Sequence, residues 1–530
     1  MKNYLVFSVA TLAVVSNAFA QQRVVKPNLK AYPFMPYETS LIQDKVKALT
    51  ENEDFLRDIH EMERRGLNKG KTKSQPWGGF YWAIDQGGIA NKYQEKSFLN
   101  MLDPTRRDWK DNVGDYRKYA QKTHPQIYTI SEDKLAKLSP AEKYDILLGD
   151  TTFDLTNKVW DYTEKWGEAK RYSFMSEIDM PSGYVLRPLE KDDKKMAAWE
   201  GFCHGWALAA GNYPRPLKTV TVTLPNGKKM PFYPTDIKAL VTLMWAHSNV
   251  QNNIIFEGNR CNSKDPVKDE HGRYLEPECA DVHPGVFHAA VVNIVGLEGR
   301  SMVVDKAATF AIANQPVAGY ELEYFNPKTG DDGALSKSLL SIREYGKDDN
   351  FAASRNKEAT HIVGVSMKLK YVQWENPKKG KNNEDSDDGI GEMKFNYDLE
   401  INQHGEIVGG QWRVKKNGDS AIFGNKTGQP DFFWIAPKDW KKYFGGLSSL
   451  PTWDFNKNSL PPRAYQLAAL GAHSYVHEES ARFLAKAPTC PVIPEKGDLK
   501  AVKWVDCAFR LPQPQPLIQV IDKLLEMSRK

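Results

Sequence analysis

Apolar and polar positions follow three different patterns along the chain. Residues 21–125 are rich in charged and aromatic side chains and predict a helix near residues 41–65, ended by Gly66. Residues 126–345 alternate between helical and strand-like periodicity, and residues 346–530 are mainly strand-like at first. No internal repeat is visible. The pattern predicts an α+β fold with an N-terminal helical region that packs beside the core or is a pro-segment, a central core and a C-terminal β-containing extension.

Several elements can be placed more closely. A capping box that begins at Ser139 predicts a helix start, and residues 235–236 open a second helix. Residues 360–374 and 393–412 predict strands, the second with a hairpin turn at 404–405.

Residues 199–210 predict a helix that is buried in the core, because apolar side chains recur at helical spacing and the remaining face is apolar too. A cysteine near the start of such a helix lies at the positive end of the helix dipole, which favours the thiolate over the thiol. Cys203 is therefore a candidate nucleophile. The alternative is that it is an inert apolar residue, as most buried cysteines are.

The composition is that of an ordinary globular protein, with 41% hydrophobic and 26% charged residues among 530. The formal charge of +5, from 72 basic and 67 acidic residues, is too mild to indicate nucleic acid as a partner. Residues 1–20 predict a signal peptide that ends in Ala18-Phe19-Ala20, and no apolar stretch is long enough to span a bilayer. We expect an exported protein, secreted or periplasmic.

Five cysteines leave an odd thiol in an exported chain. Local spacing favours two disulfides, Cys261–Cys279 and Cys490–Cys507, although other pairings remain possible. The favoured pairing leaves Cys203 free.

A cysteine nucleophile needs a base and a group that orients the base. Residues 283–295 predict a turn and a strand with His288 near its start, and residues 301–305 predict the returning strand that ends at Asp305. Such a hairpin brings His288 close to Asp305. Taken alone, a histidine on an apolar strand is usually a core residue and an aspartate at a strand end a turn residue. The chain order Cys, His, Asp is that of papain-like and transglutaminase-like cores.

The segment from Trp199 to Ala207 resembles the active-site segment of the transglutaminase elicitor family, known from oomycete plant pathogens and bacterial relatives. Residues 284–288 and 303–305 are similar to that family as well, and weaker similarity extends over roughly 126–437. Another segment is similar to the peptide that plants perceive as an elicitor; its residues are Asn314, Gln315, Pro316, Val317, Gly319 and Tyr320. The resemblance implies a transglutaminase-like or papain-like core, in which a buried helix packs against an antiparallel sheet.

The resemblance also implies a protein-glutamine gamma-glutamyltransferase. Cys203 would form a thioester with a glutamine side chain and a lysine amine would then attack it, giving an isopeptide cross-link. His288 would transfer the protons and Asp305 would fix its tautomer. The Cys203 N–H, with an indole N–H from Trp199 or Trp206, is a candidate donor to the oxyanion, unless the two tryptophans only fill the core. The expected partners are proteins with accessible glutamine and lysine.

Other interpretations remain open. The same triad could serve a cysteine peptidase or a deamidating amidase, or the protein could be a non-catalytic elicitor or binding protein. A further alternative is a zinc site formed by Cys261, Cys279, His283 and His288. The spacing of these residues is irregular for zinc ligands, and export favours disulfides instead.

We expect no cofactor or metal, with calcium dependence left open. The one dense acidic run, residues 384–388 in the polar loop 376–389, lacks the spacing of a calcium loop.

Overall fold

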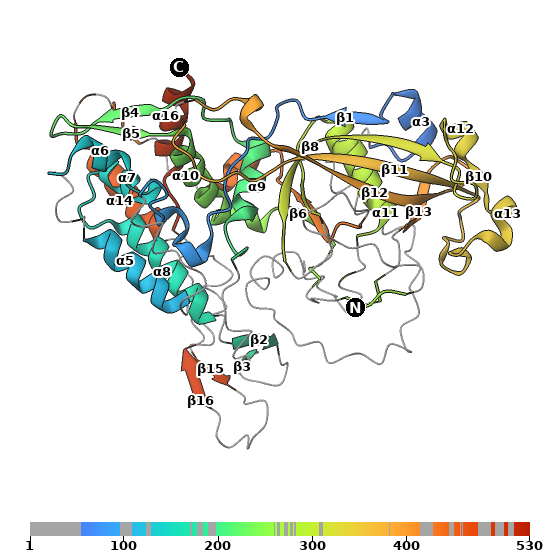
Figure 1. The fold of residues 1–530 in the computed structure, drawn as a ribbon, viewed down its shortest axis with the longest axis horizontal. Coiled ribbons are helices and arrows are strands. Elements are labelled where there is room, and N and C mark those ends of the chain that lie inside the picture. Colours follow the sequence, from blue (N-terminus) through green and yellow to red (C-terminus); the bar gives the residue numbers. More distant parts are fainter. Residues whose placement is uncertain are drawn as a thin grey trace, which may run out of the picture.

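The computed structural model combines a helical half and a half of long antiparallel strands (Figure 1). Among the described residues, no helix is long and apolar enough to cross a membrane. The described residues are 55–95, 109–122, 124, 129–169, 172–176, 184–188, 198–258, 260–261, 266–269, 274–275, 279, 282–306, 311–380, 382–413, 428–444, 450–455, 457, 459–474, 489–492, 503–506 and 514–530.

A ten-stranded sheet organises the described part of the chain. Its main strand order is β13-β12-β11-β8-β7-β14-β6, and β1 and β9 pair with β8 while β10 pairs with β11. The strands are β1 (Lys69–Lys71), β6 (Ile255–Gly258), β7 (Val303–Asp305), β8 (Asn314–Phe325), β9 (Asp332–Gly333), β10 (Leu340–Ser341), β11 (His361–Val372), β12 (Ile390–Ile401), β13 (Ile407–Trp412) and β14 (Phe432–Ile435).

The helices lie mainly beside the β6 end of this sheet, whereas α11 lies against β12 and β13 (Figure 1). They are α3 (Ile59–Arg64), α5 (Trp109–Gln121), α6 (Glu132–Ala136), α7 (Pro140–Leu147), α8 (Asp154–Ala169), α9 (Cys203–Asn212), α10 (Pro234–Ala246), α11 (Pro284–Ala290), α12 (Leu335–Ser338), α13 (Ile342–Tyr345), α14 (Arg463–His473) and α16 (Ile518–Arg529). A hairpin joins β4 (Val220–Thr223) to β5 (Lys229–Phe232), and a small sheet contains β2 (Tyr172–Ser176), β3 (Tyr184–Pro188), β15 (Thr489–Val492) and β16 (Lys503–Asp506).

Local sequence signals place several of these elements correctly, and the α+β class is confirmed. The Ser139 hydroxyl accepts a hydrogen bond from the Glu142 N–H at 3.2 Å, and the Glu142 carboxylate accepts one from the Ser139 N–H at 2.9 Å, so the predicted capping box begins α7. The second predicted helix is α10. The strands β11, β12 and β13 also occur, and Gly405 adopts a φ of 83° in the turn between β12 and β13.

Two apolar cores lie on opposite faces of the sheet at β7 and β14. Val303 and Phe432 pack in one core with α9 and α10, which we call the helical core. Val304 and Phe433, the next residues along the same strands, pack in the other core with α11, which we call the β core. Because successive side chains of a strand point to opposite faces, Asp305 lies on the same face as Val303, toward the helical core.

The predicted hairpin from His288 to Asp305 is wrong. Residues Pro284–Ala290 form α11, and the chain continues as a π-helix over Val291–Leu297 before reaching β7. Every side chain from 284 to 295 is buried. An apolar run that is buried all round has no face-to-face alternation, so its periodicity does not separate strand from helix.

The described part of the N-terminal region is integrated into the fold. Of the helix expected near residues 41–65, the described residues contain α3, after which Gly66 adopts a φ of 69°. Strand β1 pairs with β8, Ile59 packs in the β core, and Trp77 and Trp82 pack in the helical core. Removal of residues 55–95 would therefore take a strand from the sheet and side chains from both cores.

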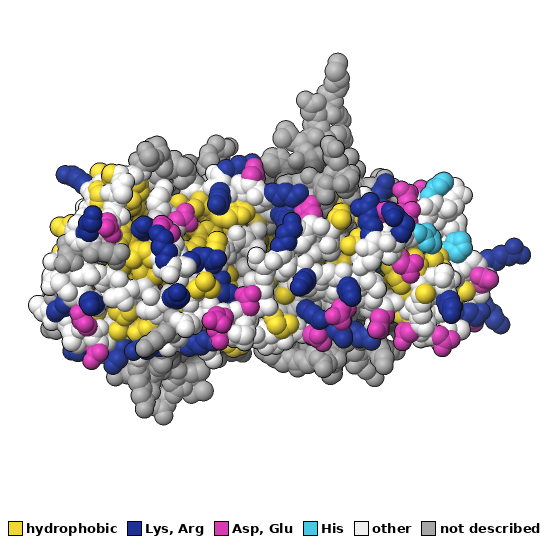
Figure 2. Space-filling view, turned by 90° about the horizontal axis from the view of Figure 1, so that it is seen from above, with side chains coloured by type: hydrophobic (Ala, Val, Ile, Leu, Met, Phe, Trp, Pro, Cys, Tyr) yellow, Lys and Arg dark blue, Asp and Glu magenta, His cyan; other side chains and the backbone are white. Residues whose placement is uncertain are grey.

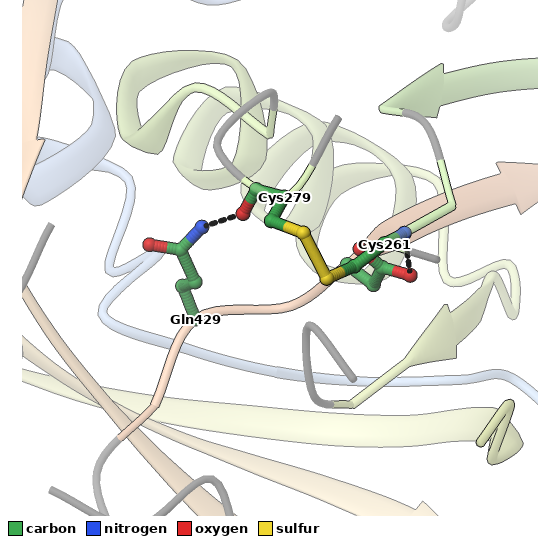
Figure 3. The surroundings of a disulfide bond; sticks show 4 residues. Cys261, Cys279 and Gln429 are labelled. Carbon is green, nitrogen blue, oxygen red and sulfur yellow. Dashed lines mark hydrogen bonds between the residues drawn. A yellow bond between two sulfur atoms is a disulfide. The ribbon is translucent and has the colours of Figure 1, made fainter. Parts of the chain in front are cut away.

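The cysteines agree with the local pairing where the structure describes them. Cys261 and Cys279 form a disulfide (Figure 3). Cys203 is a free thiol. The expected Cys490–Cys507 pair lies outside the described side chains.

Candidate active site

Cys203 is the first residue of α9, and the four residues before it are not helical. Gly201 forms an antiparallel β-bridge with Ala83, and the Phe202 N–H donates to the Tyr81 carbonyl at 2.6 Å. A Cβ atom at Gly201 would lie 2.3 Å from that carbonyl oxygen, so this close approach requires glycine. The chain pairing holds the start of α9, and with it Cys203, in a fixed position.

Two other residues of the motif hold α9 in the core. A Cβ atom at Gly205 would lie 2.3 Å from the Thr242 carbonyl, so only glycine permits this contact with α10. The Trp206 indole N–H donates to the Trp77 carbonyl at 3.2 Å, and Trp206 is buried. The Trp206 indole N–H is therefore already used in this hydrogen bond and does not serve as an oxyanion donor in this structure.

The Cys203 thiol receives hydrogen bonds and is acted on by the negative charge of Asp305. The Asn314 side-chain N–H donates to its sulfur at 3.3 Å, and the backbone N–H groups of Cys203 and His204 also point at the sulfur. Burial raises the pKa of Cys203 to about 11, the Asn314 hydrogen bond opposes this rise, and the charge of Asp305 adds to it. The residue is partly exposed. At neutral pH it is therefore a thiol, with donors arranged around the sulfur.

Asp305 occupies the strand position beside Asn314. Within the sheet, Asp305 pairs with Asn314 on β8 and with Phe432 on β14, so all three share the face toward the helical core. Its carboxylate accepts a hydrogen bond from the Ala313 N–H at 2.9 Å, and its side chain is completely buried. The sheet therefore presents a carboxylate and a carboxamide side by side to the start of α9.

His288 lies elsewhere. It projects from α11 into the β core, where its Nδ1 lies 2.8 Å from the Tyr397 hydroxyl. Burial lowers the pKa of His288 to about 3, so this imidazole is neutral at physiological pH. The structure thus brings Cys203 and Asp305 together and leaves His288 on the opposite face of the sheet. The expected contact between His288 and Asp305 depended on the hairpin that does not form.

This separation predicts how Cys203 responds to substitution of His288. The variant H288N keeps a polar atom near the position of Nδ1, and we expect the rate of Cys203 alkylation by iodoacetamide to stay within about twofold of wild type between pH 6 and 9. Thermal or urea unfolding should show a loss of about 1–3 kcal/mol, because a buried hydrogen bond is weakened. The variant N314A, which removes a donor to the sulfur, should slow alkylation at the same pH values. A loss of more than tenfold in H288N would instead place His288 beside the thiol.

The elicitor-like residues form the first half of β8. They are buried between β7 and β11, with Val317 and Tyr320 in the β core. Asn314, the first of them, is the residue that donates to the Cys203 sulfur. The segment that resembles a plant-perceived peptide is thus a central strand of the sheet and contributes directly to the candidate site.

Sequence reasoning missed an aromatic surface that includes Tyr81, the residue hydrogen-bonded to Phe202 at the start of α9. The rings of Tyr81 and Trp374 meet edge to face with centroids 5.6 Å apart, and Phe80 packs against both. Trp374 is 41% exposed, and the charge of Cys203 acts on the Tyr81 hydroxyl. These three residues come from segments almost 300 residues apart, so the sequence carries no local signal for this surface.

Sequence reasoning also missed a buried cation near the site. Arg260 is 6% exposed, and its guanidinium lies 5.5 Å from the ring centre of Trp199. The charges of Glu200, Asp305 and Asp431 act on it. Trp199, proposed above as an oxyanion donor, is therefore also the aromatic partner of this arginine.

Among the described residues, no group of three or more His, Cys, Asp or Glu side chains could hold a metal ion. The proposed zinc site is excluded, because two of its ligands, Cys261 and Cys279, are joined in a disulfide.

In the acidic run, the fully buried Asp388 side chain forms a salt bridge with Arg215 at 2.5 Å and accepts a hydrogen bond from the Gly78 N–H at 2.8 Å. The Asp388 carboxylate thus links the polar loop 376–389 to Gly78 in the N-terminal region and to Arg215.

On the face that Figure 2 shows, Lys and Arg side chains are interspersed with Asp and Glu. This face has no continuous basic patch.

Comparison with known proteins gives a family and one similar solved structure. The sequence matches the family model described as "Transglutaminase elicitor" over residues 129–442, more than half of the chain. The crystal structure of the GP42 transglutaminase from Phytophthora sojae is similar with a TM-score of 0.45 and 18% identity, covering 74% of this chain and 90% of that chain. A search of curated proteins finds no match. The match to the family model spans both Cys203 and Asp305 and shows that this chain belongs to the transglutaminase elicitor family.

Proposed function

We propose that this protein is a protein-glutamine gamma-glutamyltransferase that uses Cys203 as its nucleophile. The observation that carries the proposal is the free thiol at the first position of a buried helix, with Asn314 donating to the sulfur and the Asp305 carboxylate next to it. Membership of the family supports the class of reaction. The expected partners are proteins with accessible glutamine and lysine side chains.

In the first half-reaction the Cys203 sulfur attacks the side-chain amide carbon of glutamine. Because the thiol is protonated at neutral pH, its proton leaves as the new C–S bond forms, and Asp305, whose charge acts on the thiol, accepts it. The amide oxygen gains negative charge in the same step. The donors around the sulfur can stabilise it: the N–H groups of Cys203 and His204 and the carboxamide of Asn314. When the C–N bond breaks, Asp305 returns the proton to the departing nitrogen. Ammonia is released, and the glutamine acyl group remains on Cys203 as a thioester.

In the second half-reaction a neutral lysine amine attacks the thioester carbon. Asp305 takes a proton from the amine, the C–S bond breaks, and the sulfur recovers its proton. The product is an isopeptide cross-link, whereas attack by water would give glutamate. The surface of Phe80, Tyr81 and Trp374 offers apolar area, and Tyr81 is hydrogen-bonded to the residue before Cys203, so we propose that a lysine stem packs there and displaces water. His288 takes no part in these steps and serves the packing of the β core.

The location is part of the proposal. The sequence predicts a leader over residues 1–20, and the disulfide Cys261–Cys279 fits an oxidising compartment. We therefore propose an exported protein.

The deciding experiment supplies the purified protein with dimethylcasein and monodansylcadaverine, with calcium and with EDTA, and follows both incorporated fluorescence and released ammonia. We expect ammonia release and fluorescence to rise together. Ammonia without fluorescence would make the protein a deamidase. Casein cleavage without either would make it a peptidase, and no reaction at all would favour a non-catalytic elicitor.

A further inference from the structure

Arg260 is a buried cation in an acidic surrounding. It is 6% exposed, and burial lowers its pKa while the charges of Glu200, Asp305 and Asp431 raise it again. All three carboxylates are themselves buried. Carboxylates that share a buried site repel one another, and one of them takes up a proton unless a cation compensates. Arg260 supplies a positive charge on which the charge of Asp305 acts.

A disulfide and four hydrogen-bond contacts hold the chain next to Arg260, and Figure 3 shows the disulfide and the hydrogen bond from Gln429 to Cys279. The next residue, Cys261, is bonded to Cys279, and the Cys261 N–H donates to both carboxylate oxygens of Asp431 at 3.0 and 2.9 Å. The Asp431 N–H donates in turn to the Asp305 carbonyl at 3.0 Å. Gln429 donates to the Cys279 carbonyl at 2.8 Å. The disulfide is thus connected to the backbone of Asp305 through one residue.

We propose that Arg260 is a positioning residue for Asp305, which it keeps ionised and oriented toward Cys203, and that the disulfide Cys261–Cys279 holds Arg260 there. The inference rests on the proposed function, in which Asp305 carries the proton. It deepens that function, because it assigns the charge state of the base to a residue outside the catalytic motif. It also gives the disulfide a role beyond stability.

The test uses the pH profile of glutamine-dependent ammonia release by the full-length protein. The titratable and charged groups near Asp305 are the Cys203 thiol on α9, Arg260, Asp431 next to β14, and Lys306, which follows it in the chain; Glu200 acts on Arg260. The acidic limb of the profile is the pH range in which kcat falls as the base becomes protonated. Removing the positive charge in R260M should move this limb to higher pH by about one pH unit. It should also lower kcat about 10²-fold and leave KM within about twofold of wild type. R260K keeps the charge and should restore the position of the limb.

Other variants decide between positioning and mere stability. D431N removes a negative charge but keeps an acceptor for the Cys261 N–H, and it should move the acidic limb downward; it also tests the charge argument if R260M does not fold. The double variant C261S/C279S should move the limb upward like R260M. The exposed matched control R343M should leave it in place.

Three results would overturn the assignment. An unmoved limb in both R260M and D431N would reduce Arg260 to a packing residue. An unmoved limb in C261S/C279S, with only a lower melting temperature, would limit the disulfide to stability. A wild-type protein that releases no ammonia from glutamine would overturn the proposed function and this assignment with it.

Discussion

The variant C203A should lose both ammonia release and amine incorporation, by at least about 10⁴-fold. The reason is that Cys203 is the free thiol among the cysteines that the structure describes, and the thioester forms on it. The thiol is the acyl carrier in both half-reactions, so its removal leaves the donors and Asp305 with no bond to form. Cys203 is partly exposed at the start of α9, and its truncation leaves the packing of Gly205 and Trp206 in place. The melting temperature should therefore stay within about 2 °C of wild type.

Two comparisons make this result specific. C203S keeps the volume and a hydroxyl but has a far weaker nucleophile, and it should be nearly as inactive as C203A. K347A changes an exposed residue of the distant turn at 346–348, and it should retain full activity. Activity of C203A within tenfold of wild type would show that another residue forms the acyl intermediate.

The fold could be predicted where local signals are strong. The capping box at Ser139 and the turn at Gly405 rely on hydrogen bonds and backbone angles between near neighbours, and both elements appear at the expected places. The segment from His288 to Val295 has no such signal. Its β-branched residues suggest a strand, but the surrounding β core buries every side of it, and Asn293 bonds there to both the N–H and the carbonyl of Leu56. A partner more than 200 residues away decides that conformation.

The candidate site divides in the same way. Cys203 and Asp305 could be found from their own surroundings, one at the start of a buried helix and the other at the end of an apolar strand. Asn314 was visible only as part of a peptide resemblance, and its hydrogen bond to the sulfur follows from the pairing of β7 with β8. Arg260 and Trp374 contact other residues of the region that lie far away in the sequence, so residue spacing gives no signal for them. His288 shows the converse error, since a suitable residue type in the right order lies on the wrong face of the sheet.

Substitution of Asp305 by asparagine should change two properties of the site in opposite directions. D305N keeps the shape of the side chain and an acceptor for the Ala313 N–H, but it cannot take a proton. We expect ammonia release to fall about 10²- to 10⁴-fold, as is typical when a general base is lost. Iodoacetamide should nevertheless alkylate Cys203 about three- to tenfold faster at pH 8. The charge of Asp305 raises the pKa of the thiol, so its removal increases the thiolate fraction at that pH.

The opposite signs separate a base from a structural residue. Loss of fold would slow the enzymatic reaction, lower the melting temperature and give the thiol the pKa of a free cysteine, about 8.5. Loss of the charge alone should instead move the alkylation profile toward lower pH by about one pH unit or less, with the melting temperature unchanged. The matched control D332N, on the exposed strand β9, should change neither rate. Slower alkylation together with slower ammonia release would mean that Asp305 stabilises the thiolate through other groups, and the proton would then need a different acceptor.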